Sequence, residues 1–205
     1  MKALLLVDIQ NDFLPGGALA VNQGNMIIPI VNQLVPKFDL VVATQDWHPA
    51  NHESFASNHA GGQVGQIIDL HGLTQVLWPD HCIQNTRGAE FSSELETEKA
   101  QRIFRKGTDP TVDSYSGFYD NDHRNDTGLG TYLKEKEVDQ LYVVGLATDY
   151  CVKFTALDAA ALGFETTVIT DAVRAVNLDS NDGNKALQEM KQSGVRLLQS
   201  NEISS

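Results

Sequence analysis

The chain has 205 residues, 41% of them hydrophobic and 20% charged, which is enough apolar material for one folded domain with a core. Its formal net charge of −12 disfavours nucleic acid and anionic membrane surfaces as partners, because both are bound through clustered Lys and Arg. The two cysteines, Cys82 and Cys151, are too few for a disulfide framework or a four-cysteine zinc site. The sequence shows neither a signal-peptide core nor a membrane-spanning stretch, so a cytoplasmic protein is expected.

Six short apolar runs have the length and the β-branched content of strands that are buried on both faces. They lie at residues 3–7, 40–43, 102–104, 141–144, 166–169 and 195–198. Apolar residues at helical spacing occur at residues 26–34, 150–162 and 184–192. Because strands and helices alternate along the chain, the pattern predicts an α/β fold with a parallel sheet, helices on both of its faces, and one domain over residues 1–205.

Residues 44–86 interrupt this pattern, since they show no clear strand or helix and are rich in His, Asn, Gly and Gln. Five of the six histidines fall in this stretch, at positions 48, 52, 59, 71 and 81. A structureless segment of this length in a compact domain is usually functional. The sequence therefore predicts an elaborate insertion at about residues 44–86 that binds a metal.

Polar side chains follow the first four predicted strands. Asp8 comes after the first strand, Asp46 and His48 after the second, Lys106 after the third, and Cys151 shortly after the fourth. In open α/β sheets, ligands bind beyond the carboxyl ends of the strands. These side chains are therefore expected to meet at one rim of the sheet.

Cys151 is the candidate nucleophile, although a lone cysteine is more often a small core residue. It lies in the first turn of a predicted helix, where free N–H groups and the helix dipole favour the thiolate. Asp8 as base and Lys106 as nearby cation would complete an activated nucleophile, and backbone N–H groups of residues 147–151 could hold an oxyanion. Asp12 could replace Asp8, but Asp8 is favoured because it lies directly at the strand end.

The histidine-rich insertion supplies candidate metal ligands. Asp46 and His48 place two ligands on one extended segment, and His81 follows a proline in the stretch WPDHC at residues 78–82. Two histidines and one carboxylate suit Zn, Fe or Mn with coordination positions left for water. His59 and His71 are interpreted as surface or hydrogen-bonded residues.

These motifs together resemble the isochorismatase-like cysteine hydrolases, and among them the nicotinamidase/pyrazinamidase branch. The matching stretches run through nearly the whole chain in the family's order. They are LVDIQNDF at 6–13, TQDWHP at 44–49, WPDHC at 78–82, FRKG at 104–107 and VGLATDYCV at 144–152. The resemblance implies a three-layer sandwich with a six-stranded, mainly parallel sheet flanked by helices.

The resemblance also implies the roles of individual residues. Asp8, Lys106 and Cys151 would form the catalytic triad. The N–H groups of Ala147 and Cys151 would form the oxyanion hole, with a cis peptide between Leu146 and Ala147.

Further implied roles concern the metal and the substrate. The metal ligands would be Asp46, His48 and His81, with zinc as the first choice and iron or manganese as alternatives. His52 or water would complete the metal shell. The residues in contact with the pyridine ring of the substrate would be Phe13, Trp78 and Tyr150.

The reaction implied is hydrolysis of nicotinamide to nicotinate and ammonia through a thioester on Cys151, in NAD salvage, with pyrazinamide as a further substrate. One alternative is another amidohydrolase of the superfamily, acting on a carbamoyl or ureido group. Ligand chemistry alone also allows a non-haem Fe(II) oxygenase. A non-catalytic metal or redox sensor would use the thiols of Cys82 and Cys151. If the chain hydrolyses nicotinamide, its partner is a small-molecule substrate. A homo-oligomer is also compatible with the sequence.

Overall fold

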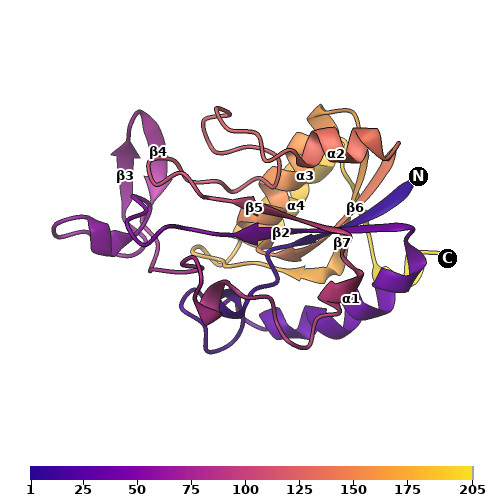
Figure 1. Ribbon diagram of the computed structural model, residues 1–205, viewed down its shortest axis with the longest axis horizontal. Helices are drawn as coiled ribbons and strands as arrows, with labels where there is room; N and C mark the ends of the chain where they lie inside the picture. The colour runs from indigo at the N-terminus through magenta and orange to yellow at the C-terminus, as the bar shows by residue number, and fades with distance from the viewer. Residues whose placement is uncertain (205) are drawn as a thin grey trace.

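The computed structural model in Figure 1 describes residues 1–204. Its main sheet has the strand order β5-β2-β1-β6-β7-β8, and every neighbouring pair is parallel. The strands are β1 (Lys2–Val7), β2 (Leu40–Asp46), β5 (Arg102–Lys106), β6 (Gln140–Leu146), β7 (Glu165–Arg174) and β8 (Arg196–Leu198). All six predicted strands are confirmed, and β2 and β5 run two to three residues further than the apolar runs that predicted them.

Helices cover both faces of the sheet, which confirms the three-layer sandwich (Figure 1). They are α1 (Ile28–Leu34), α2 (Leu129–Glu135), α3 (Lys153–Ala161) and α4 (Asp182–Gln192). The side chains of β1 alternate between the two layers, as a strand's period of two requires. Leu4 and Leu6 belong to the core cluster that contains the buried residues of α1, whereas Leu5 belongs to the cluster beneath α2, α3 and α4.

Two helical predictions need correction. The seven-residue helix α2 was not predicted, because its one and a half to two turns are too short for a helical period to stand out in the sequence. The helix predicted from residue 150 begins instead as a π-helical turn at Thr148–Val152, and regular α3 starts at Lys153. Cys151 therefore lies inside the π-helical turn, a form that is rare and often found at functional sites.

The insertion at residues 44–86 is more regular than predicted. It contains an antiparallel hairpin made of β3 (Ile67–Leu70) and β4 (Leu73–Val76), which projects from one end of the molecule in Figure 1. His71 and Gly72 form the tight turn between them with φ of 54° and 92°. The prediction of no strand was wrong because β3 is mostly exposed, so its sequence lacks the buried alternation by which a strand is identified.

Among residues 1–204, no helix is both long enough and apolar enough to cross a membrane.

Candidate active site

The carboxyl ends of four neighbouring strands bring the predicted catalytic side chains together. Asp46 and Lys106 are register partners at the ends of β2 and β5, and Asp8 follows β1 directly. Cys151 comes from the π-helical turn after β6, the strand on the other side of β1. The cis peptide expected between Leu146 and Ala147, where β6 leads into this turn, is confirmed.

Lys106 is the centre of this group. Its Nζ lies 2.6 Å from Asp46 Oδ1, 3.0 Å from Asp8 Oδ2 and 3.4 Å from Cys151 Sγ, and it donates to the Ser114 carbonyl oxygen at 2.7 Å. The Lys106 side chain is completely buried, so the two carboxylates compensate its charge where water cannot. Burial opposes that charge, but Asp46 and Asp8 raise the pKa of Lys106 well above its ordinary value. A permanent cation therefore lies beside the thiol.

The pKa of the Cys151 thiol and the pKa of the Asp8 carboxyl are both raised above their ordinary values. Burial raises the pKa of Cys151 well above that of a free thiol, although the charge of Lys106 opposes this. Burial also raises the pKa of Asp8, against the effect of Lys106, and Thr44 Oγ1 donates to Asp8 Oδ1 at 2.6 Å. Burial therefore opposes the stabilisation of the thiolate that the position of Cys151 in a first helical turn predicted. A neutral thiol next to a carboxylate with raised proton affinity is arranged for proton transfer during the reaction.

Asp12, the sequence's alternative to Asp8, lies elsewhere. Its Oδ2 accepts a hydrogen bond from the backbone N–H of Cys82 at 2.7 Å, and its Oδ1 accepts one from Ala18 N at 3.2 Å. The Cys82 carbonyl in turn accepts from the backbone N–H of His48 at 3.0 Å. Asp12 thus fixes the backbone at residue 82, next to His81.

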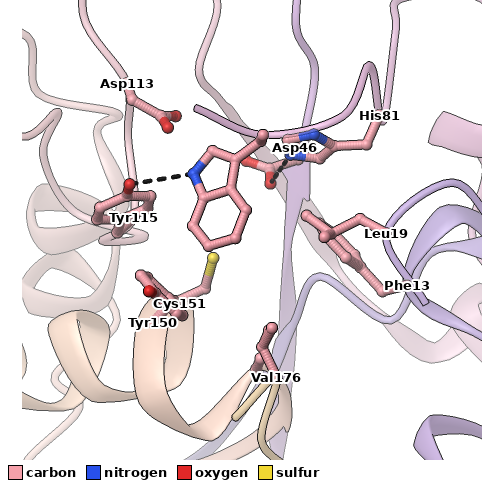
Figure 2. A pocket seen from close by; sticks show the side chains of 11 residues that line it. Phe13, Leu19, Asp46, His81, Asp113, Tyr115, Tyr150, Cys151 and Val176 are labelled. Atoms are coloured by element: carbon pink, nitrogen blue, oxygen red, sulfur yellow. Dashed lines mark hydrogen bonds and ion pairs between the residues drawn. The ribbon is translucent and has the colours of Figure 1, made fainter. Parts of the chain in front are cut away.

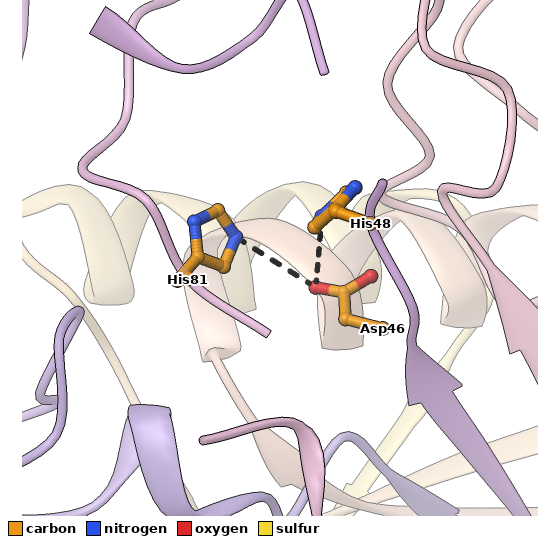
Figure 3. Close-up of side chains that lie close together, drawn as sticks. All are labelled: Asp46, His48 and His81. Carbon is orange, nitrogen blue, oxygen red and sulfur yellow. Dashed lines mark ion pairs between the residues drawn. The ribbon is translucent and has the colours of Figure 1, made fainter. Parts of the chain in front are cut away.

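Asp46, His48 and His81 form a buried cluster in which one ligand atom of each lies within 4.8 Å of the others (Figure 3). Asp46 Oδ2 lies 3.8 Å from His48 Nε2 and 4.0 Å from His81 Nε2. The Nδ1 atoms face backbone carbonyls, that of Gly107 at 3.0 Å for His48 and that of Pro79 at 2.8 Å for His81. A carbonyl only accepts, so Nδ1 carries the proton and the lone pair of each Nε2 faces Asp46.

The donor set of this cluster fits a divalent metal. Within residues 1–204, His48 Nε2 is buried without a hydrogen-bond partner, as expected for an atom whose partner is an ion. Burial, with the charge of His48, lowers the pKa of His81 to about 4, so this imidazole is neutral at neutral pH and free to ligate. The Nε2 atoms of His48 and His81 and the carboxylate of Asp46 together make a candidate metal-binding site.

His52 is buried next to this cluster but differs from it in its tautomer. Its Nδ1 accepts from the backbone N–H of Ser54 at 3.1 Å, so the proton of the neutral ring belongs on Nε2. Burial lowers the pKa of His52, which keeps the ring neutral. Within residues 1–204, His52 Nε2 is buried without a hydrogen-bond partner, and His52, His48 and Asp113 form a second group whose candidate ligand atoms lie within 4.8 Å of one another.

His59 and His71 lie away from the cluster, as their interpretation in the sequence required. His59 Nε2 contacts the Glu53 carbonyl at 2.6 Å, and His71 Nε2 pairs with the Glu53 carboxylate at the surface.

A cavity of about 360 Å³ opens above Cys151 and Asp46 (Figure 2). Aromatic and aliphatic side chains form most of its walls, and the thiol, Asp46 and His81 supply its polar groups. All three side chains that the resemblance assigned to the substrate are among its lining residues, which are Phe13, Leu19, Asp46, Trp78, His81, Asp113, Tyr115, Ala147, Tyr150, Cys151 and Val176. Such a cavity suits a flat, mostly apolar ligand of small size.

Four of these lining residues were not found from the sequence. Asp113 and Tyr115 lie in the long loop after β5, Leu19 lies in the loop after β1, and Val176 follows β7. None of them stands at the end of a predicted strand, and none belongs to a recognisable ligand spacing. Only Asp113, an acidic residue that follows the apolar Val112, could have been noticed from its sequence neighbours, and this indication of a functional residue is weak.

Over residues 2–202 the sequence matches the isochorismatase domain family. It is 49% identical to the nicotinamidase of Escherichia coli (strain K12) over 200 aligned residues. The alignment covers 96% of this chain and 93% of that protein. The structure is similar to that of an Acinetobacter baumanii nicotinamidase/pyrazinamidase, with a TM-score of 0.95 and 52% identity over 98% of this chain and 97% of the other.

The structure is also similar to a pyrazinamidase of Pyrococcus horikoshii in complex with zinc, with a TM-score of 0.79 and 42% identity over 97% of this chain and 98% of the other. The match to the family extends from β1 to β8. The chain therefore belongs to the isochorismatase domain family.

Proposed function

We propose that this chain is a nicotinamidase that hydrolyses nicotinamide to nicotinate and ammonia, with Asp8, Lys106 and Cys151 as its catalytic triad. The observation that carries the proposal is the position of Lys106 Nζ, which contacts the candidate base and also the two side chains, Cys151 and Asp46, that line the aromatic cavity. The identity to relatives named nicotinamidase supports this choice of substrate.

The first half of the reaction forms the thioester. Asp8 accepts the thiol proton as Cys151 Sγ attacks the carboxamide carbon, and the charge of Lys106 stabilises the developing thiolate. The oxyanion accepts hydrogen bonds from the N–H groups of Ala147 and Cys151, each worth about 3–4 kcal/mol in other acyl-transfer enzymes. Protonated Asp8 then gives its proton to the departing amino group, which leaves as ammonia.

The second half releases the acid. Asp8 takes a proton from water as the water oxygen attacks the thioester carbon. The bond between the acyl carbon and Cys151 Sγ then breaks, which releases nicotinate, and the Cys151 thiolate recovers the proton from Asp8. Burial of Asp8 suits both halves, because a carboxylate with raised pKa is a stronger base at neutral pH.

Substrate orientation is assigned to two parts of the cavity. Phe13 and Trp78, with Tyr150, contact the pyridine ring. Asp46, His48 and His81 would hold one divalent metal, which would supply an electron-pair acceptor for the ring nitrogen. The zinc complex of the Pyrococcus horikoshii relative supports zinc, and the two-histidine, one-carboxylate set also suits iron or manganese.

Three broader points complete the proposal. The chain acts as a single hydrolase domain in which residues 44–86 form the metal-binding insertion, and it acts in NAD salvage. Pyrazinamide is a second substrate, since the Acinetobacter baumanii relative is named for both amides. Because the mechanism needs Cys151 as a reduced thiol, we place the enzyme in the cytoplasm.

The direct test is ammonia release from nicotinamide by purified protein, before and after chelation and after zinc is restored. We expect turnover that falls on chelation and returns with zinc, and equal rates with and without dioxygen. Release from a carbamoyl or ureido substrate, with none from nicotinamide, would instead support the other amidohydrolases. A requirement for dioxygen and a reductant would support the oxygenase alternative.

A further inference from the structure

Trp78 forms one wall of the cavity, and its backbone is fixed by the neighbouring segment of the insertion. Trp78 N donates to the Ser54 carbonyl at 2.8 Å, and the Trp78 carbonyl accepts from Ala56 N at 2.9 Å. Backbone pairing of this kind leaves the side-chain torsions of the indole undetermined. The orientation of the ring must therefore come from its own contacts.

The Tyr115 hydroxyl supplies one such contact. Trp78 Nε1, which can only donate, points to Tyr115 Oη at 3.1 Å, the hydrogen bond drawn as a dashed line at Tyr115 in Figure 2. Burial, together with the charge of Asp113, raises the pKa of Tyr115 well above its ordinary value, so the phenol stays neutral. Tyr150 touches both rings edge-on, with centroids 4.9 Å from Trp78 and 5.3 Å from Tyr115.

Gln75 is a second contact of the Tyr115 hydroxyl. Its Nε2 lies 3.2 Å from Tyr115 Oη, 3.1 Å from Asp113 Oδ2 and 2.7 Å from the Val76 carbonyl. A carbonyl and a carboxylate only accept, so the amide nitrogen, and not its oxygen, must occupy this position. Gln75 is 2% exposed although it belongs to the hairpin strand β4, most of whose residues are not buried.

We propose that Tyr115 and Gln75 are positioning residues that set the orientation of the Trp78 ring and, through it, the binding of the substrate's aromatic ring. Trp78 Nε1 and Gln75 Nε2 both lie within hydrogen-bonding distance of one buried hydroxyl, and the bond from Trp78 Nε1 restrains the torsions of the indole. The hairpin of the insertion thereby acts on the substrate wall without touching the substrate. The part that concerns substrate rests on the function proposed above.

Two nearly isosteric substitutions remove this arrangement. Tyr115→Phe deletes the shared acceptor, and Gln75→Met deletes the amide while keeping its length. We expect KM for nicotinamide to rise about tenfold in each variant while kcat stays within about twofold, since ring binding is weakened and the triad is untouched. In the double variant, KM should rise by less than the product of the two single increases, because both substitutions act through one hydroxyl.

Tyr119→Phe is the matched control. It deletes a phenol oxygen from the same loop, where the Tyr119 ring stacks on His123 outside the cavity, and it should leave KM and kcat unchanged.

Trp78 can be observed without substrate, because the chain has only two tryptophans. In a Trp47→Phe background, Trp78 is the only indole. Adding Tyr115→Phe to that background should shift the emission maximum and add a fast, nanosecond component to the anisotropy decay, as the ring gains freedom. Tyr119→Phe in the same background should change neither. Circular dichroism checks that each variant is folded.

Two results would overturn the proposal. The first is unchanged Trp78 emission and anisotropy after Tyr115→Phe, which would show that packing against Tyr150 alone orients the indole. The second is a fall in kcat with unchanged KM. If the parent protein released no ammonia from nicotinamide, the proposed function would fail, but the fluorescence comparison would still decide whether Tyr115 orients Trp78.

Discussion

The rim of the sheet and the loops above it contribute to the active site in different ways. Asp8, Asp46 and Lys106 stand at strand ends, where the register of the ladder fixes their backbones, and they share one buried network of charges. Trp78 and Tyr115 come from loops, and hydrogen-bonding contacts between side chains join them to each other and to Gln75. We infer that the rim supplies chemistry together with stability, whereas the loops supply recognition at little cost to the fold.

The largest effect is expected for the rim nucleophile. Cys151→Ala should lower ammonia release at least about 10⁴-fold, because no other group can form the thioester. Metal stoichiometry, measured by atomic emission, should stay unchanged, since Cys151 is not among the proposed ligands. Residual activity near that of the parent enzyme would exclude the proposed mechanism, and Cys82→Ser serves as the control for loss of a buried thiol.

Lys106→Met should separate the two regions most clearly, because it affects stability as well as catalysis. Without the ammonium, Asp8 and Asp46 are left as neighbouring buried carboxylates. We expect the free energy of unfolding to fall by about 3–5 kcal/mol, as measured for broken buried ion pairs, along with loss of activity. Urea denaturation of the metal-free proteins measures this, and a drop below about 1 kcal/mol would contradict the role of the rim in stability.

His81→Ala should weaken metal binding strongly and change the free energy of unfolding little, the opposite of Lys106→Met. It removes one proposed ligand from the insertion, and zinc affinity should fall more than about 100-fold, beyond the effect reported for outer-shell partners. Unfolding of the metal-free protein should change little compared with Lys106→Met, because the sheet network is intact. Equilibrium dialysis gives the affinity, and His71→Ala, at a surface histidine of the same insertion, is the matched control.

The pH dependence of kcat/KM should report Asp8. Asp8 must be ionised to accept the thiol proton, and burial raises its pKa, so protonation should inactivate the enzyme at a pH above the ordinary carboxyl value of about 3.9. Below that point kcat/KM should fall about tenfold per pH unit. Metal content is measured at each pH to separate this loss from release of metal. An acid limb at or below 3.9 would show that Asp8 is not the base.

The smallest effect is expected for His52→Gln. His52 Nε2 carries the ring proton, so the substitution should leave zinc stoichiometry at one and lower zinc affinity less than about tenfold. Zinc titration of the metal-free variant checks this. A loss as large as that of His81→Ala would mean that His52 is a direct ligand.

The sequence predicted the rim well and the loops poorly, and particular residues show why. Asp46 and Lys106 follow apolar runs that can be read as strands, and parallel strands bring their carboxyl ends to one edge whatever their loops do. Asp113 and Tyr115 lie in the irregular loop between β5 and α2, so their place depends on how that loop folds over the sheet. Gln75 lies in a hairpin whose strands are mostly not buried, so its sequence lacks the apolar alternation by which a strand is predicted.

The amino-acid sequence was sufficient to predict the six-stranded parallel sheet, the edge of the sheet at which the reactive side chains meet, and the motifs by which the family is identified. Strand periodicity and strand-end chemistry are local, so they can be read from neighbouring residues. Only the folded structure shows that burial raises the pKa of Cys151 and of Asp8, that Ser54 N donates to His52 Nδ1, and that Gln75, Tyr115 and Trp78 are in contact. These depend on burial and on partners far apart in the chain, because removal from water sets proton affinities and a hydrogen bond needs both of its atoms in place.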